Sequence, residues 1–147
     1  MVKFEHLIMV FTERRIDMTY NHGAQTIETY EGKRIIKSGA VGATNAEEVK
    51  WLIDGLTKLS VPFKNDGWGY ICDIGKMAPV TPDVSEILVG LHKRLAECNC
   101  KAMAFVNFAA FITGAQAKEH SKKSHTGIVE ATFRTEEEAI KWIESVI

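Results

Sequence analysis

Apolar positions alternate with a period of two residues along the first part of the chain. Two sets of residues share this step: Leu7, Met9 and Phe11, followed by Ile16, Met18 and Tyr20. Side chains two residues apart lie on one face of a β-strand, so the spacing predicts strands. Glu31-Gly32 then separates two β-rich runs, residues 26–30 and 33–37. Because glycine readily adopts the positive φ of a tight turn, the pattern predicts an antiparallel hairpin.

The period becomes helical after Thr44. The apolar residues at this spacing are Val49, Leu52, Ile53, Leu56 and Leu59. Thr44 and Glu47 have capping-box spacing, and Pro62 ends the predicted helix. Residues 68–73 follow as a short β-rich run, which predicts a central strand.

A second helix is predicted to begin at Thr81-Pro82-Asp83 and to reach about Cys98. Threonine can cap a helix, proline is tolerated at its first position, and aspartate favours the positive end of the helix dipole. The apolar face consists of Val84, Ile87, Leu88, Leu91 and Leu95. This face is expected to pack on the sheet.

The rest of the chain continues the alternation of strand and helix. Residues 101–108 are nearly all apolar, as in a strand covered on both faces, and a weaker helix is expected over 113–123. Residues 128–134 predict another strand, and Thr135 with Glu138 predicts a cap for the last helix. The expected fold is α/β: a single domain over 1–147 with a mixed, mostly parallel sheet, begun by an N-terminal antiparallel hairpin, and about four helices.

Composition and charge narrow the possible partners. Of the 147 residues, 46% are hydrophobic, and 18 basic residues stand against 19 acidic ones. The resulting net charge of −1 gives no field that would attract a nucleic acid or an anionic bilayer. The longest nearly apolar run, residues 102–112, is shorter than the roughly 18 to 20 residues of a membrane span.

The three cysteines, Cys72, Cys98 and Cys100, do not have the spacing of a disulfide framework. The first residues also lack the pattern of a signal peptide, so a cytoplasmic protein is expected. Cys98 and Cys100 with His92 form only a weak metal-binding pattern, and ordinary burial of free cysteines explains them better. No metal or cofactor is expected.

The most favoured candidate site begins at Asp73, at the end of the predicted central strand. Ligands of open α/β sheets bind at the carboxyl ends of strands and at adjoining helix N-termini, where free backbone N–H groups collect. The candidate binding residues are Asp73, Lys76, Met77, Thr81 and Ser85. The simpler alternative is that Asp73 only satisfies loop amides and that Thr81 only caps its helix.

Two segments of the sequence resemble SpoIIAA-like proteins of the STAS superfamily. One is the strand Gly69-Tyr70-Ile71-Cys72-Asp73 before the helix near Thr81, and the other is the closing stretch Thr132-Phe133-Arg134-Thr135-Glu136-Glu137-Glu138-Ala139-Ile140-Lys141-Trp142-Ile143. The resemblance covers residues 30–147 and concerns fold and packing. It implies a regulatory or binding module without catalysis, whose surface between Asp73 and Ser85 meets a protein partner or a small ligand.

The resemblance also implies how such a module could be regulated. Anti-sigma-factor antagonists of the superfamily carry an Asp-Ser pair whose serine is phosphorylated, but this chain has Asp73-Ile74. Phosphorylation would have to occur at Thr81 or Ser85. Other members resemble lipid-transfer folds, which gives a second hypothesis: a carrier or sensor of an apolar molecule. Its possible lining residues are Trp51, Trp68, Met77, Phe108 and Phe111, for which an ordinary place in the core is the favoured interpretation.

A third hypothesis is a small enzyme with Asp73 as general base, although the common catalytic motifs are missing. The basic stretch 118–125 is interpreted as a solvated helix face, and residues 39–43 as a simple strand-to-helix turn. His6 and His22 are assigned no role. A homodimer is conceivable, because the N-terminal strands could pair at the edge of the sheet.

Overall fold

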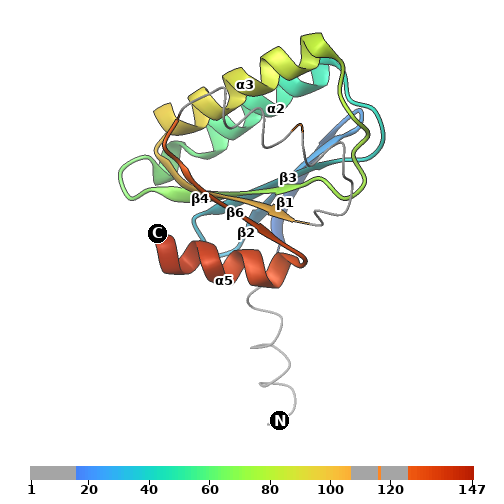
Figure 1. The fold of residues 1–147 in the computed structure, drawn as a ribbon. Coiled ribbons are helices and arrows are strands. Elements are labelled where there is room, and N and C mark those ends of the chain that lie inside the picture. The colour runs from blue at the N-terminus through green and yellow to red at the C-terminus, as the bar shows by residue number, and fades with distance from the viewer. Residues whose placement is uncertain (1–15, 107–115, 117–125) are drawn as a thin grey trace.

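The computed structural model describes residues 16–106, 116 and 126–147 of the chain (Figure 1). Its six strands form one sheet in sequence order: β1 (Ile16–His22), β2 (Gln25–Tyr30), β3 (Ile35–Ala40), β4 (Trp68–Asp73), β5 (Cys100–Val106) and β6 (Val129–Phe133). β2 pairs antiparallel with both β1 and β3, and β3 to β6 run parallel. The predicted hairpin is confirmed as β2 and β3, with Gly32 at φ 72°. The strand residues expected from Leu7 to Phe11 lie outside the described part.

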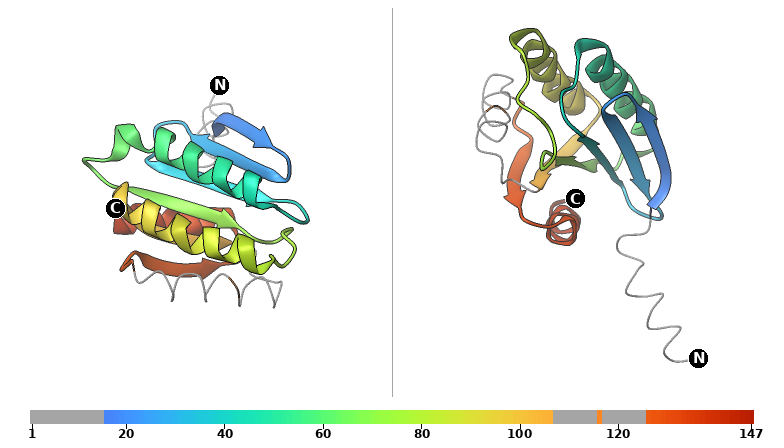
Figure 2. Two further views of the ribbon diagram at one scale, coloured as in Figure 1. Left: turned by 90° about the horizontal axis from the view of Figure 1, so that it is seen from above. Right: turned by 90° about the vertical axis from the view of Figure 1, so that its right-hand side faces the viewer.

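Within the described residues, three α-helices cover the two faces of this sheet. α2 (Ala46–Leu59) and α3 (Pro82–Glu97) lie side by side on one face, and α5 (Glu136–Val146) lies on the other (Figures 1 and 2). A short 3-10 helix, η1 (Val61–Phe63), follows α2 and contains Pro62. The described residues contain three α-helices, fewer than the predicted number of about four. The helix expected over 113–123 lies outside them, apart from Gln116.

The sheet separates two apolar cores because its side chains alternate between faces. In β4, Trp68 and Tyr70 pack toward α2 and α3, whereas Ile71 packs toward α5. β5 has buried residues on both faces, as its apolar sequence predicted. We therefore call the two faces the α2/α3 face and the α5 face.

The caps of the helices confirm one prediction and correct two. Thr135 caps α5, since its Oγ1 accepts from Glu138 N. The capping box of α2 is formed by Asn45 and Glu48, one residue later than the predicted Thr44 and Glu47. Thr81 occupies the N-cap position of α3, but its hydroxyl makes no capping bond. It donates to Asp83 Oδ1 instead.

β1 is one edge of the sheet, where pairing with a second copy was considered. The register of its pairing with β2 shifts between Ile16 and Thr19, as at a β-bulge or a similar irregularity. Bulges of this kind are one way in which proteins blunt an edge against further strands. The homodimer stays a prediction.

Candidate functional site

The loop after β4, residues 74–81, is paired with the loop after β3. Gly42 N donates to Lys76 O at 2.8 Å, and Ala78 N donates to Gly42 O at 2.9 Å. These bonds form a parallel bridge between Gly42 and Met77, with Gly42 at φ 77°. The backbone of loop 74–81 is therefore held against the carboxyl edge of the sheet.

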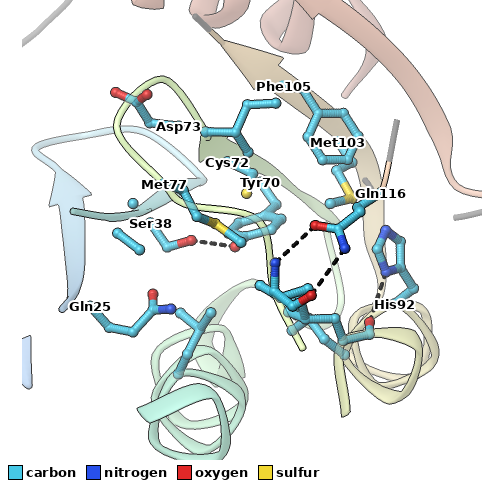
Figure 3. Close-up of a pocket in the computed structure, with 17 residues that line it drawn as sticks. Gln25, Ser38, Tyr70, Cys72, Asp73, Met77, His92, Met103, Phe105 and Gln116 are labelled. Atoms are coloured by element: carbon cyan, nitrogen blue, oxygen red, sulfur yellow. Dashed lines mark hydrogen bonds between the residues drawn. The ribbon is translucent and has the colours of Figure 1, made fainter. Parts of the chain in front are cut away.

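Asp73 closes β4, as the sequence predicted, and its side chain belongs to the α5 face. It pairs in register with Gly39 and Val106, next to Cys72, which packs on the α2/α3 face. Its Oδ1 accepts from Gly75 N at 3.0 Å, and its Oδ2 lies 4.0 Å from Lys37 Nζ. Figure 3 shows its carboxylate pointing away from the cavity described below.

Lys37 forms ion pairs with carboxylates from three elements on this face. Its Nζ lies 2.8 Å from Glu136 Oε1 on α5 and 3.6 Å from Glu28 Oε1 on β2. Burial lowers the pKa of Lys37, but the hydrogen bond to Glu136 and the charges of Glu136, Glu28 and Asp73 raise it above its ordinary value. A cleft beside this cluster is lined by Thr26, Glu28, Lys37, Gly39, Ala40, Val41, Asp73 and Lys76.

A separate cavity of about 40 Å³ lies between the sheet and the helices α2 and α3 (Figure 3). Its lining is mostly apolar and comes from β2 to β5, α2, α3, loop 74–81 and Gln116. Two buried hydroxyls belong to this lining, those of Ser38 and Tyr70, and they hydrogen-bond to each other. Cys72, a half-buried residue whose thiol is buried, lies on the same wall.

The titratable side chains on the α2/α3 face of the cavity are uncharged near neutral pH. Burial raises the pKa of Tyr70 well above its ordinary value and that of Cys72 to about 11. Burial lowers the pKa of His92, whose Nδ1 lies 3.0 Å from Leu88 O. A cysteine that remains a thiol is a weak nucleophile, so Cys72 has no features of a catalytic group.

Loop 74–81 and Gln116 complete the cavity wall. Met77 and Val80 of the loop both line it. Gln116 Oε1 accepts from Val80 N at 2.9 Å, and Gln116 Nε2 donates to Val80 O at 3.1 Å. These two bonds tie the loop to the chain beyond β5.

The predicted site residues do not all lie together: some are exposed on the surface, and others contribute to the lining of the cavity. Met77 is half-buried in the cavity wall, whereas Lys76 and Thr81 are exposed. Ser85 is half-buried in the first turns of α3, and its N–H donates to Thr81 O. Sequence reasoning missed the Ser38–Tyr70 pair. The available signal was that Ser38 follows Ile36 by two residues in β3 and therefore lies on the same face of that strand.

Two of the five lining residues expected for a carrier, Trp51 and Trp68, do not line the cavity. Trp51 stacks on His22, with ring centroids 5.3 Å apart, and Trp68 Nε1 donates to Cys98 O. Met77 alone of the expected residues lines the cavity, while Phe108 and Phe111 lie outside the described part. The basic stretch 118–125 and His6 also lie outside it.

Within residues 16–106, 116 and 126–147, no three His, Cys, Asp or Glu side chains come together to hold a metal ion. Cys100 Sγ donates to Ala102 O. No described helix is both long enough and apolar enough to cross a membrane.

No protein-family model and no curated protein matches the sequence. Solved structures do resemble the fold. An uncharacterised DUF3478-family protein with a SpoIIAA-like fold from Shewanella loihica PV-4 is 15% identical, with 86% of this chain and 99% of that chain covered and a TM-score of 0.64. The unphosphorylated anti-sigma factor antagonist SpoIIAA is 13% identical, with 84% and 99% covered and a TM-score of 0.57.

A third match is a chain in the complex of the diguanylate cyclase SiaD with its activator SiaC from Pseudomonas aeruginosa. It is 11% identical, with 81% of this chain and 100% of that chain covered and a TM-score of 0.52. At identities this low, structural similarity shows the fold alone, and function has to be argued from the site. The resemblance seen in the sequence is confirmed at that level: this chain has a SpoIIAA-like fold.

Proposed function

We propose that this chain is a regulatory module without catalysis, and that the surface between Asp73 and Ser85 binds a protein partner. The observation that carries the proposal is the pairing of loop 74–81 with Gly42. This pairing holds Lys76 and Thr81, both exposed, in a fixed arrangement at the carboxyl edge of the sheet. A preformed surface loses less conformational entropy on binding than a flexible loop does.

The similar solved structures support a regulatory role. They include an anti-sigma factor antagonist and a complex between an enzyme and its activator. Those names describe those proteins, and we extend only the general role, the control of another protein by binding, to this chain.

The two alternatives find less support in the geometry. A lipid-like cargo would need a pocket of about 300–1,000 Å³, whereas the cavity measures about 40 Å³. The carboxylate of Asp73, the proposed general base, lies on the opposite face of the sheet from the cavity and accepts a hydrogen bond from Gly75 N. The carrier and the enzyme therefore stay secondary predictions.

Phosphorylation at Thr81 or Ser85 remains part of the proposal as a means of regulation. The hydroxyl of Thr81 is exposed at the start of α3, where the helix dipole favours a phosphate. The carboxylate of Asp83, which accepts from that hydroxyl, would repel the phosphate. Modification of Thr81 would thus break the Thr81–Asp83 bond and change the shape of the surface.

Photo-crosslinking in the host tests the proposed surface. A crosslinking residue at Lys76 is expected to capture one protein, and the same residue at the exposed Lys93 on α3 is not. The captured protein is then purified and its affinity is measured directly. Lys76→Glu and Asp83→Lys should each weaken binding at least about tenfold, a loss of about 1.4 kcal/mol, and Lys93→Glu should leave it unchanged.

The proposal fails under either of two results. One is capture at Lys93 as efficient as capture at Lys76. The other is a purified partner that binds the Lys76→Glu and Asp83→Lys variants as tightly as the native chain.

A further inference from the structure

We propose that the cavity between the sheet and helices α2 and α3 is a binding site for a small neutral molecule that has an apolar body and one hydrogen-bonding group. This inference concerns a ligand behind the partner surface, and it stands or falls independently of the protein partner.

The wall combines apolar side chains with one buried pair of hydroxyls. Leu52, Met103 and Phe105 contribute apolar surface from α2 and β5. Ser38 is 2% exposed and Tyr70 is 0% exposed. The Cys72 thiol also interacts with both hydroxyls. Because a hydroxyl offers one donor and two lone pairs, the pair still has lone pairs that can accept a hydrogen bond from a further group. Pockets for small molecules typically have this composition, an apolar lining with a few fixed polar groups.

The same wall disfavours a charged ligand. Its polar side chains on the α2/α3 face are neutral: two glutamines, a serine, a tyrosine, a thiol and an unprotonated histidine. Asp73 contributes to the lining, but its carboxylate points away toward the α5 face. Burying an ion without a partner of opposite charge is costly, so selection for neutral ligands follows.

The size of the cavity limits the ligand. A single water needs about 10–15 Å³, so a cavity of about 40 Å³ holds only a few atoms. Met77 and Met103 both line the space, and methionine is unbranched and adapts its shape readily. Repacking of these two side chains would admit a short alcohol or a phenol but not a lipid chain.

Met77 links the cavity to the surface of the molecule. Its side chain lines the cavity, while its backbone forms the bridge to Gly42. Val80, three residues later, lines the same cavity and is held by Gln116. A ligand that moves Met77 would therefore also shift the backbone around Lys76.

Nuclear magnetic resonance of methionine methyl groups tests the site with reporters that the chain already contains. The protein is labelled with 13C at the methionine methyls and titrated with isobutanol and with phenol. Saturable shifts are expected at Met77 and Met103, with a Kd on the order of 1 mM for so few buried atoms. Met18, which is 49% exposed on β1, should not shift with them. Benzoate, an anionic analogue of phenol, should produce no saturable shift.

Cavity-filling variants identify the place of binding. Cys72→Leu fills the space and keeps both hydroxyls, and Ser38→Val fills it and removes one of them. Each should weaken binding at least tenfold, whereas Cys98→Val, at a half-buried position outside the cavity lining, should not. Circular dichroism establishes whether each variant is folded. If one of the two cavity-filling variants does not fold, the other still tests the site.

Three results would overturn the proposal. They are the absence of saturable shifts with both neutral probes, binding that persists unchanged in a folded cavity-filling variant, and binding of benzoate as tight as that of phenol. The first two would refute the site, and the third would refute its preference for neutral ligands.

Discussion

Gly69 of β4 lies directly against Ile143 of α5. A Cβ built on Gly69 would be 2.2 Å from Ile143 Cγ2 and 3.2 Å from its Cβ. Only a residue without a side chain lets α5 approach the sheet this closely. The position of α5 in turn places Glu136 beside Lys37, so the packing at Gly69 and the ion pairs near Asp73 depend on the same helix.

Gly69→Ala is therefore expected to destabilise the protein. Displacing Ile143 in a packed core should lower the free energy of unfolding by about 1–3 kcal/mol, measured by urea denaturation. In an Ile143→Ala background the same change should cost less, because its neighbour has been shortened. Gly90→Ala is the matched control. Gly90 is an exposed position of α3 with open space around it, and alanine there should stabilise the helix by about 0.5–1 kcal/mol.

Lys37→Met is expected to destabilise by removing the cation that Glu28, Asp73 and Glu136 share. The side chains of Lys37 and Glu136 are only 15% and 11% exposed, so the carboxylates lose a poorly solvated partner. A loss of about 1–3 kcal/mol follows. Lys58→Met removes an ion pair with Asp54 whose side chains are 75% and 64% exposed, and it should cost less than about 0.5 kcal/mol.

The direction in which the stabilising effect of Lys37 changes with pH follows from its pKa. The pKa of Lys37 is raised above 10.5 in the folded protein. Its contribution to stability is therefore full below pH 10.5 and is lost as the pH rises through the folded value. The difference in stability between native protein and Lys37→Met should be constant near neutral pH and should shrink above pH 10.5. A difference in stability that stays constant through that range would show that the charge of Lys37 does not stabilise the folded protein.

Sequence periodicity predicted the hairpin, the parallel strands and the faces of the helices, because burial on one face requires a regular repeat. It placed the cap of α2 one residue too early. Thr44 and Asn45 are both good capping residues, and the choice between them depends on β2. Gln25 Nε2 donates to Thr44 Oγ1, and Thr44 Oγ1 donates to Glu48 Oε1, so Asn45 is left to cap the helix. Contacts between distant segments of this kind have no local pattern.

The sequence was sufficient to predict at which edge of the sheet the candidate site lies. The end of β4 at Asp73 follows from the strand pattern, and the rule for parallel sheets points to that edge. The cavity was not predictable, since it depends on which face Cys72 and Ser38 share and on the pairing of Met77 with Gly42. Those relationships join segments that are more than thirty residues apart.

The three cysteines should differ strongly in reactivity. Burial raises the pKa of Cys72 to about 11 and that of Cys100 to about 12, and only the thiolate reacts with alkylating agents. Under native conditions at mildly alkaline pH, iodoacetamide should modify the half-buried Cys98 first, Cys72 more slowly and Cys100 only on unfolding. Mass spectrometry of peptides over time measures the order. Alkylation of Cys72 as fast as that of Cys98 would contradict the burial of its thiol, and the protein unfolded in urea serves as the control for intrinsic reactivity.

His92 should make the protein less stable in mild acid. Burial lowers its pKa below the ordinary 6.5, against the opposite effects of its hydrogen bond to Leu88 O and of the charge of Glu130. Below pH 6.5 the unfolded chain therefore binds a proton that the folded chain does not, so the free energy of unfolding falls until the pH reaches the folded pKa. A titration of the imidazole resonances, assigned with His92→Leu, measures the folded pKa directly. In that variant the component of acid sensitivity due to His92 should be absent. A His92 pKa at or above 6.5 would mean that the cavity wall is hydrated enough to accept the charge.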